Sequence, residues 1–208
     1  MTSRELVYRT LEFENKTGKV PRQMWTLPYS EWNYPDMIKK IRCDYPEDII
    51  GAPNILGERT IEEGDPYRKG TSRDAWGCLV ENIFEGIIGE VRTPLVQDED
   101  WEDVSQIHIP KEWLTFDREE VNRFCENTDC FVLSTCCPRP FEQLQFIRKT
   151  ENLYMDLLDI PEGMKKFMDK MHAFYCELLE EWAKTKVDAL TFMDDWGSQR
   201  SLLINPAI

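Results

Sequence analysis

The sequence lacks any apolar run near the ~18 consecutive residues that a membrane-spanning helix needs. Its start, MTSRELVYRTLEFENKTGK, is charged throughout and has no apolar signal-peptide core. Both absences predict a cytoplasmic protein. Cations are also scarce, since 25 Lys and Arg stand against 39 Asp and Glu, a formal charge of −14. This balance argues against nucleic acid and against an anionic membrane surface as partners.

Metal-binding spacings are missing as well. The only histidines are His108 and His172, and the seven cysteines contain no C-x-x-C pair. Zinc needs three or four converging N or S ligands, so we predict no metal site within these residues. An odd cysteine count in a chain of this size indicates reduced thiols. Cys136 and Cys137 follow a predicted strand, where they could line the mouth of a cavity.

Apolar periodicity predicts short buried strands that alternate with helices. Thr2 and Glu5 have capping-box spacing, which predicts a helix over 3–14. The strongest helical pattern covers 162–184, where apolar residues recur at three- and four-residue steps. Strand–helix alternation indicates an α/β fold with a parallel sheet. Further helices are expected at 35–43, 117–127, 141–148 and 150–158, strands at 20–27, 48–53, 131–135 and 187–193, loops at 54–73 and 97–103, and a hairpin excursion near 76–96.

The segment after the last predicted strand is rich in candidate site residues. Asp194 and Asp195 end that strand, and Trp196 and Gln199 follow on the same loop. In parallel α/β folds the carboxyl ends of the strands form the ligand site. These side chains are therefore candidate binding or catalytic groups. The alternative is that one carboxylate caps a helix or pairs with an arginine.

Two earlier positions are also candidates. Asp74 stands beside Trp76 in an Asp-x-Trp-Gly cluster, and an aromatic neighbour can desolvate a carboxylate and raise its pKa for acid/base work. The alternative is a turn aspartate with Trp76 in the core. Arg22, which precedes Gln23, could clamp a carboxylate or phosphate, or could form a salt bridge at the rim of an acidic protein.

These motifs, in this order, resemble the uroporphyrinogen decarboxylase superfamily, in particular its methyltransferase-like branch. Lys19-Val20-Pro21 resembles the R/K-V-P strand that opens the family fold, and Asp74-Ala75-Trp76-Gly77 is similar to its D-E-W-G segment. The run from Asp194 to Gln199, ending in Asn205-Pro206, resembles its D-D-W-G-x-Q…S-P signature. The resemblance implies a TIM (β/α)8 barrel, here incomplete, with 1–208 as a single domain that forms about the first five units.

The resemblance also implies roles for the candidate residues. True decarboxylases carry an R-Q-A-G-R motif whose arginines hold propionates, and here only Arg22 and Gln23 match it. The implied catalytic residues are Asp74 and Asp195. The implied substrate-binding residues are Arg22, Gln23, Asp194, Trp196 and Gln199.

The incomplete R-Q-A-G-R motif favours the methyltransferase-like branch of the family. Members of this branch move a methyl group from a corrinoid protein to a thiol or to tetrahydrofolate. The expected partners are a corrinoid protein, which would carry the corrinoid, or a small tetrapyrrole or pterin. The zinc of thiol-methylating members would need residues beyond this chain. The alternatives are a decarboxylase of porphyrin and heme biosynthesis and a non-catalytic fragment. An incomplete barrel leaves an unpaired edge and an apolar face, so we expect self-association.

Overall fold

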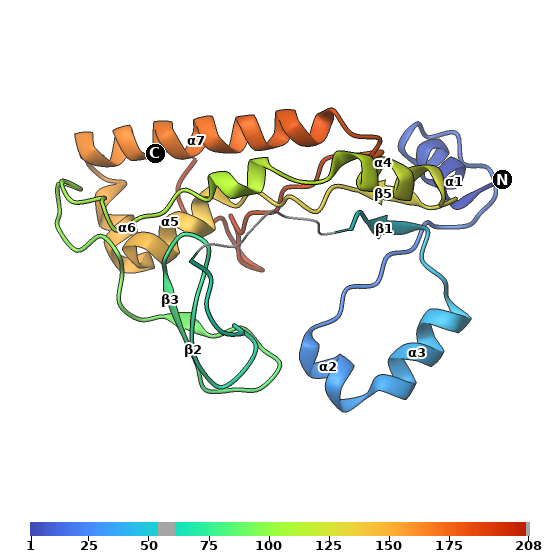
Figure 1. Cartoon of the computed structure of the whole chain (residues 1–208), viewed down its shortest axis with the longest axis horizontal. Coiled ribbons are helices and arrows are strands. Elements are labelled where there is room, and N and C mark those ends of the chain that lie inside the picture. Colours follow the sequence, from blue (N-terminus) through green and yellow to red (C-terminus); the bar gives the residue numbers. More distant parts are fainter. Residues whose placement is uncertain (54–60, 207–208) are drawn as a thin grey trace. The chain divides into compact units, whose positions relative to one another are not determined.

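The computed structural model describes residues 1–53 and 61–206 and combines helices with short strands (Figure 1). Within these residues the strands form a two-stranded and a three-stranded sheet and no closed barrel, so the incomplete barrel stays a prediction. The predicted loop at 54–73 lies partly outside the described residues. The helices are α1 (Ser3–Leu11), α2 (Pro28–Asn33), α3 (Pro35–Asp44), the 3-10 helix η1 (Lys111–Leu114), α4 (Arg118–Glu126), α5 (Pro140–Arg148), α6 (Thr150–Asp156) and α7 (Glu162–Ala183). The strands are β1 (Ile49–Gly51), β2 (Gly70–Arg73), β3 (Leu79–Asn82), β4 (Glu90–Val91) and β5 (Phe131–Leu133).

Contacts between residues divide the chain into two compact units, and α7 contributes to both. The first unit comprises Met1–Leu56, Phe116–Cys136 and Leu179–Thr191. The second unit comprises Gly57–Thr115, Cys137–Leu178 and Phe192–Ile208. Among the described residues, no helix is long and apolar enough to cross a membrane.

Parallel pairing organises the first unit. β1 and β5 lie side by side and run parallel, with Ile49 opposite Phe131 (Figure 1). A parallel bridge joins Leu133 to Ala189, so part of the predicted strand at 187–193 is the next neighbour. The parallel arrangement of these three predicted strands is confirmed, although the last is reduced to a bridge.

The predicted strand at 20–27 does not form. Pro21 has no backbone N–H to give to a ladder, and Val20 is 78% exposed, so burial does not hold the segment extended. The carbonyl of Arg22 instead accepts hydrogen bonds from the backbone N–H groups of Asp48 and Ile49. The prediction of a first strand here was wrong because it counted apolar residues that the fold leaves in solvent.

The capping box at the start of α1 is confirmed. The hydroxyl of Thr2 accepts from the N–H of Glu5 at 3.1 Å, and the Glu5 carboxylate accepts from the N–H of Thr2 at 2.9 Å. α1 ends at Leu11, earlier than predicted, because Phe13 has a φ of 60° that a helix cannot contain. Leu6 and Val7 are buried and attach the helix to the unit.

The second unit contains an antiparallel sheet in the order β2-β3-β4. The expected hairpin excursion corresponds to β3 and β4, and β2 adds a strand that the sequence did not predict. An aromatic cluster forms the core beside it. The ring of Trp76 lies 5.8 Å from that of Phe174 and 5.7 Å from that of Tyr175, both on α7.

The acidic segment 97–103 forms the exposed loop that its composition predicts, except for Trp101, which is buried. Trp101 is 2% exposed, and its indole N–H donates to the Asp156 carboxylate at 2.8 Å. Arg148 donates to the same carboxylate through Nε at 2.7 Å and Nη2 at 3.1 Å, and to the carbonyl of Val96 at 3.2 Å. This buried network anchors the segment to α5 and α6.

Candidate functional site

Asp74 follows β2 and closes the turn that leads into β3. Its Oδ1 atom accepts hydrogen bonds from the backbone N–H groups of Trp76 at 3.0 Å and Cys78 at 2.7 Å. Gly77 has a φ of 95°, a conformation that residues with a Cβ rarely adopt. Trp76 is 2% exposed. One oxygen of Asp74 therefore stabilises a turn, and Trp76 packs in the core. This is the alternative that the sequence left open for these two residues.

The other oxygen of Asp74 has a different environment. Oδ2 receives a long hydrogen bond, 3.4 Å, from Nε2 of Gln143 on α5. Among the described residues, no cation forms an ion pair with this carboxylate. Burial raises the pKa of Asp74, and hydrogen bonds from Cys78, Gln143 and Trp76 oppose that rise. A carboxyl group whose pKa is moved toward neutrality suits general acid/base work.

Asp74 lies on the wall of a cavity of about 300 Å³ in the second unit. Burial raises the pKa of the Cys137 thiol in this wall, which keeps it protonated, and the same holds for the Tyr175 hydroxyl. Arg139 pairs with Glu142 at 2.9 Å. The polar wall is thus formed by Asp74, Cys137, Arg139, Gln143 and Tyr175, and aromatic rings of Trp76, Trp113 and Phe146 also line the cavity.

Sequence reasoning did not find Arg139, Gln143 or Tyr175. A signal was present for Gln143, because it falls on the buried face of α5 together with Leu144 and Ile147. Glutamine is mostly exposed in folded proteins, so a glutamine on an apolar helix face needs a polar partner. For Tyr175 there was no such signal, since it continues the apolar pattern of α7.

Asp194 is a cap for α5. Its two carboxylate oxygens accept from the backbone N–H groups of Phe141 at 2.7 Å and Glu142 at 2.8 Å. No side chain next to α5 in the sequence caps this helix, so a distant carboxylate satisfies its first N–H groups. The structure therefore shows Asp194 as a helix cap, which was the alternative role left open by the sequence. Substrate binding by Asp194 stays a prediction.

The neighbours of Asp194 are exposed. Asp195 and Gln199 are in solvent, and neither side chain makes a hydrogen bond to the described part of the chain. Trp196 is 60% exposed and, with Asp194, lines a second cavity of about 550 Å³ whose other walls are apolar. Asp74 and Asp194 therefore contact neighbouring residues of α5 but line different cavities of the second unit.

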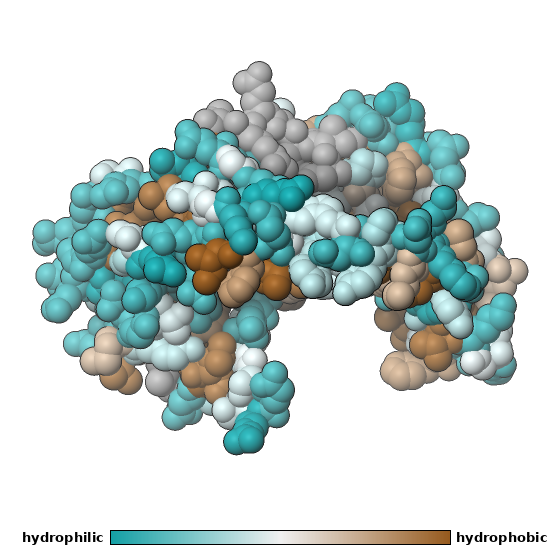
Figure 2. Space-filling model, turned by 90° about the horizontal axis from the view of Figure 1, so that it is seen from below, coloured by the Kyte–Doolittle hydropathy of each residue, from teal (hydrophilic) through white to brown (hydrophobic). Residues whose placement is uncertain are grey.

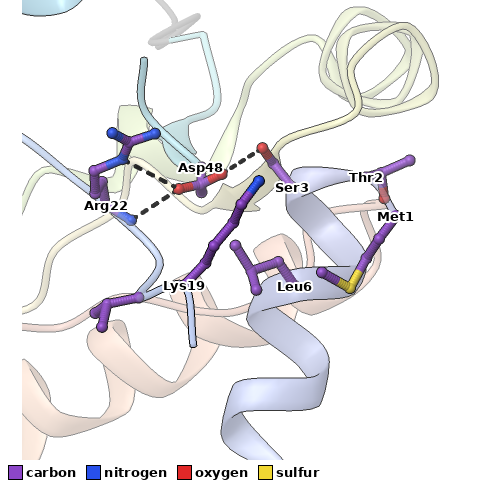
Figure 3. Close-up of a pocket in the computed structure, with 8 residues that line it drawn as sticks. Met1, Thr2, Ser3, Leu6, Lys19, Arg22 and Asp48 are labelled. Atoms are coloured by element: carbon purple, nitrogen blue, oxygen red, sulfur yellow. Dashed lines mark hydrogen bonds and ion pairs between the residues drawn. The ribbon is translucent and has the colours of Figure 1, made fainter. Parts of the chain in front are cut away.

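Arg22 belongs to the first unit. Figure 3 shows Arg22 and Ser3 on either side of Asp48, in a pocket of about 350 Å³ that Lys19 also lines. Nε of Arg22 lies 3.8 Å from Oδ2 of Asp48, and the Ser3 hydroxyl donates to Oδ1 at 2.5 Å. Arg22 thus forms the salt bridge that the sequence left open as its alternative role. Gln23 is exposed.

No group of three or more His, Cys, Asp or Glu residues is placed to hold a metal ion within 1–53 and 61–206. The resemblance implies zinc ligands only beyond this chain, so that zinc stays a prediction and we assign no step to it. All seven cysteines are free thiols. No family model, curated protein or solved structure matches this chain.

Proposed function

We propose that this chain is part of a corrinoid-linked methyltransferase, which takes a methyl group from a corrinoid protein and gives it to a thiol or to tetrahydrofolate. The observation that supports this proposal best is the half-buried Asp74 carboxyl group. It lies on a polar cavity wall, lacks a cation partner in the described part of the chain, and has a raised pKa. Such groups concentrate at functional sites because catalysis needs a proton carrier matched to its task.

Asp74 would act on the methyl acceptor. When an S–H or N–H group accepts a methyl group, a bond forms from that sulfur or nitrogen to the methyl carbon. The methyl group leaves the corrinoid without its bonding electron pair, and the acceptor releases its proton. Asp74 lines the cavity, and its carboxylate, which accepts a long hydrogen bond from Gln143, would take this proton. The corrinoid, held by the partner protein, supplies the methyl group when bound.

We also propose roles for the other residues that the sequence singled out. Asp195 is the second proposed catalytic residue, and its exposure leaves it accessible to a partner protein. We also propose that the protein acts in the cytoplasm, supported by its seven free cysteines. Arg22, Gln23, Trp196 and Gln199 are proposed to contact the substrate.

Self-association is the second proposed interaction. Several large apolar side chains face solvent, including Trp25 at 65%, Phe84 at 61% and Phe192 at 66% exposure. Figure 2 shows such hydrophobic groups interrupting the hydrophilic surface. Exposed apolar groups favour association, so static light scattering should give a mass above the 24.6 kDa of one chain. A monodisperse monomer would contradict this proposal.

The methyltransferase proposal is tested with methylcobalamin as the donor and with separate thiol and tetrahydrofolate acceptors. The visible absorbance of the corrinoid reports loss of the methyl group, and mass spectrometry of the acceptor reports its arrival. We expect turnover with one acceptor and none without the protein. Conversion of uroporphyrinogen to a decarboxylated product, with no methyl transfer, would favour the decarboxylase alternative.

A further inference from the structure

A cysteine and a histidine lie together on the solvent-facing side of α7. Sγ of Cys176 is 3.6 Å from Nε2 of His172, which stands one helical turn earlier, and both residues are exposed. The other exposed thiol of the chain is Cys43 on α3. Neither Cys176 nor His172 lines any of the three cavities described above. The pair therefore forms a cluster of its own, outside the candidate site.

The remaining five thiols of the chain are enclosed. Burial raises the pKa of the thiols of Cys78, Cys125 and Cys137, which keeps them protonated. Cys136 is buried and Cys130 is half-buried. The thiolate is the nucleophile in cysteine chemistry, and a reagent must also reach it. These five thiols are therefore poorly placed to react in the folded chain.

The imidazole of His172 is placed to take the proton of the Cys176 thiol. With its ring proton on Nδ1, the ring accepts the S–H hydrogen bond at Nε2. Transfer of that proton leaves a thiolate beside an imidazolium, the pairing that activates cysteine nucleophiles. Asp169 is exposed and precedes His172 by three positions, a spacing that places both on one face of a helix. A carboxylate there favours the charged imidazolium.

The charge around Cys176 selects the reagent. Glu177 and Glu180 are the charged residues within four positions of Cys176 along the chain, and both are exposed. Asp169 adds a third carboxylate to the exposed side of the helix. A negatively charged surface repels anionic reagents and attracts cationic ones. This part of α7 therefore favours an electrophile that carries positive charge.

We propose that Cys176 is a modification site, at which the thiol, deprotonated by His172, forms a mixed disulfide with a small cationic disulfide. The thiolate attacks one sulfur of the reagent, a new S–S bond forms, and the S–S bond of the reagent breaks. The departing sulfur keeps the bonding electron pair and receives the proton from the His172 imidazolium. The Cys176 sulfur is oxidised and the departing thiol is the reduced product. The inference goes beyond the proposed function and does not depend on methyl transfer.

The test is exposure of the full chain to cystamine, a disulfide with two amino groups, followed by acid quenching at set times and mass spectrometry of the cysteine peptides. The matched reagent is dithiodipropionate, which carries carboxylates instead. Cys43 is the internal standard, because cations outnumber carboxylates within four positions of it. The ratio of the Cys176 rate to the Cys43 rate should be about threefold or more higher with cystamine. The ratio cancels the different leaving thiols of the two reagents.

Variants locate the activating group. His172→Gln keeps a hydrogen-bonding side chain but removes the base, so the cystamine rate at Cys176 should fall by about tenfold or more. The rate at Cys43 should stay within about twofold in the same sample. The control is Lys170→Gln, an exposed change on the same helix, which should leave both rates within about twofold. Circular dichroism establishes that each variant is folded.

Three results would overturn the inference: no mixed disulfide at Cys176, the same rate ratio with both reagents, or an unchanged Cys176 rate in a folded His172→Gln variant. The reagent comparison uses the unaltered chain, so it decides the question even if His172→Gln does not fold. Neither arm measures methyl transfer, so failure here leaves the proposed function standing.

Discussion

Two carboxylates of the second unit, the buried Asp156 and the half-buried Asp74, differ in how completely they are satisfied. Asp156 receives two hydrogen bonds from the Arg148 guanidinium and one from the Trp101 indole. Asp74 receives two backbone hydrogen bonds on one oxygen, a long one from Gln143 on the other, and a further hydrogen bond from the Cys78 thiol. The first carboxylate is neutralised by a buried arginine, whereas the second lies on a cavity wall and has no ion-pair partner among the described residues. Burial alone therefore does not identify a functional carboxylate, and the state of each oxygen must be examined.

Asp194 stands between these two cases. Both of its oxygens accept from the first N–H groups of α5, and it is half-buried like Asp74. Asp194 caps the first turn of α5. Its replacement should therefore lower the free energy of unfolding less than removal of a buried ion-pair partner does, and should not alter a proton-transfer step.

The largest loss of stability is expected when Asp156, the carboxylate paired with Arg148, is removed. Asp156→Ala leaves the Arg148 guanidinium buried without its counter-charge, and breaking such a pair costs about 3–5 kcal/mol of unfolding free energy. Urea denaturation followed by circular dichroism measures it. The matched control is Asp159→Ala, an exposed aspartate three residues later, which should change stability by less than about 0.5 kcal/mol. If the two variants were equally stable, the ion pair of Asp156 with Arg148 would not stabilise the core as described.

A smaller loss is expected at the helix cap. Asp194→Ala leaves the N–H groups of Phe141 and Glu142 without their acceptor, and loss of a capping side chain costs about 1 kcal/mol. Asp195→Ala provides the control, because the neighbouring side chain is exposed and caps no helix. If Asp195→Ala were the more destabilising change, the assignment of the cap to Asp194 would be wrong.

The smallest effect concerns pH. Burial raises the pKa of Asp74 in the folded chain above its ordinary 3.8, so the folded state holds that proton more tightly than the unfolded state. The stability that this proton contributes is complete below pH 3.8 and is lost as the pH rises through the folded pKa. Asp74→Asn mimics the protonated group at every pH. Its stability relative to the original chain should therefore increase from pH 3.8 toward neutrality, as urea titrations at several pH values would show.

The sequence predicted the local structure well where one pattern dominates. The capping box of α1 and the long apolar face of α7 each appear in the structure. These features depend on residues within a few positions of one another, so spacing alone can identify them. The strand predicted at 20–27 failed because apolar content does not reveal whether a segment becomes buried.

The site was harder to predict because its parts come together from distant positions. Asp74 was found from its aromatic neighbour, but its contact with Gln143 crosses 69 positions of the chain. The cap of α5 by Asp194 and the burial of Trp101 beside Asp156 are likewise long-range. The composition of 97–103 is acidic, and only tertiary packing shows that its tryptophan belongs to the core.

The most direct test of the account is the turnover of Asp74→Asn in the methyl-transfer assay, compared with the original chain at equal protein concentration. The substitution keeps the shape and the Oδ1 acceptor of the turn but removes the proton carrier. The account predicts a folded variant whose turnover falls at least ~100-fold, the lower range for loss of an acid/base group. A folded Asp74→Asn variant with unchanged turnover would show that Asp74 only closes a turn, and would contradict the account.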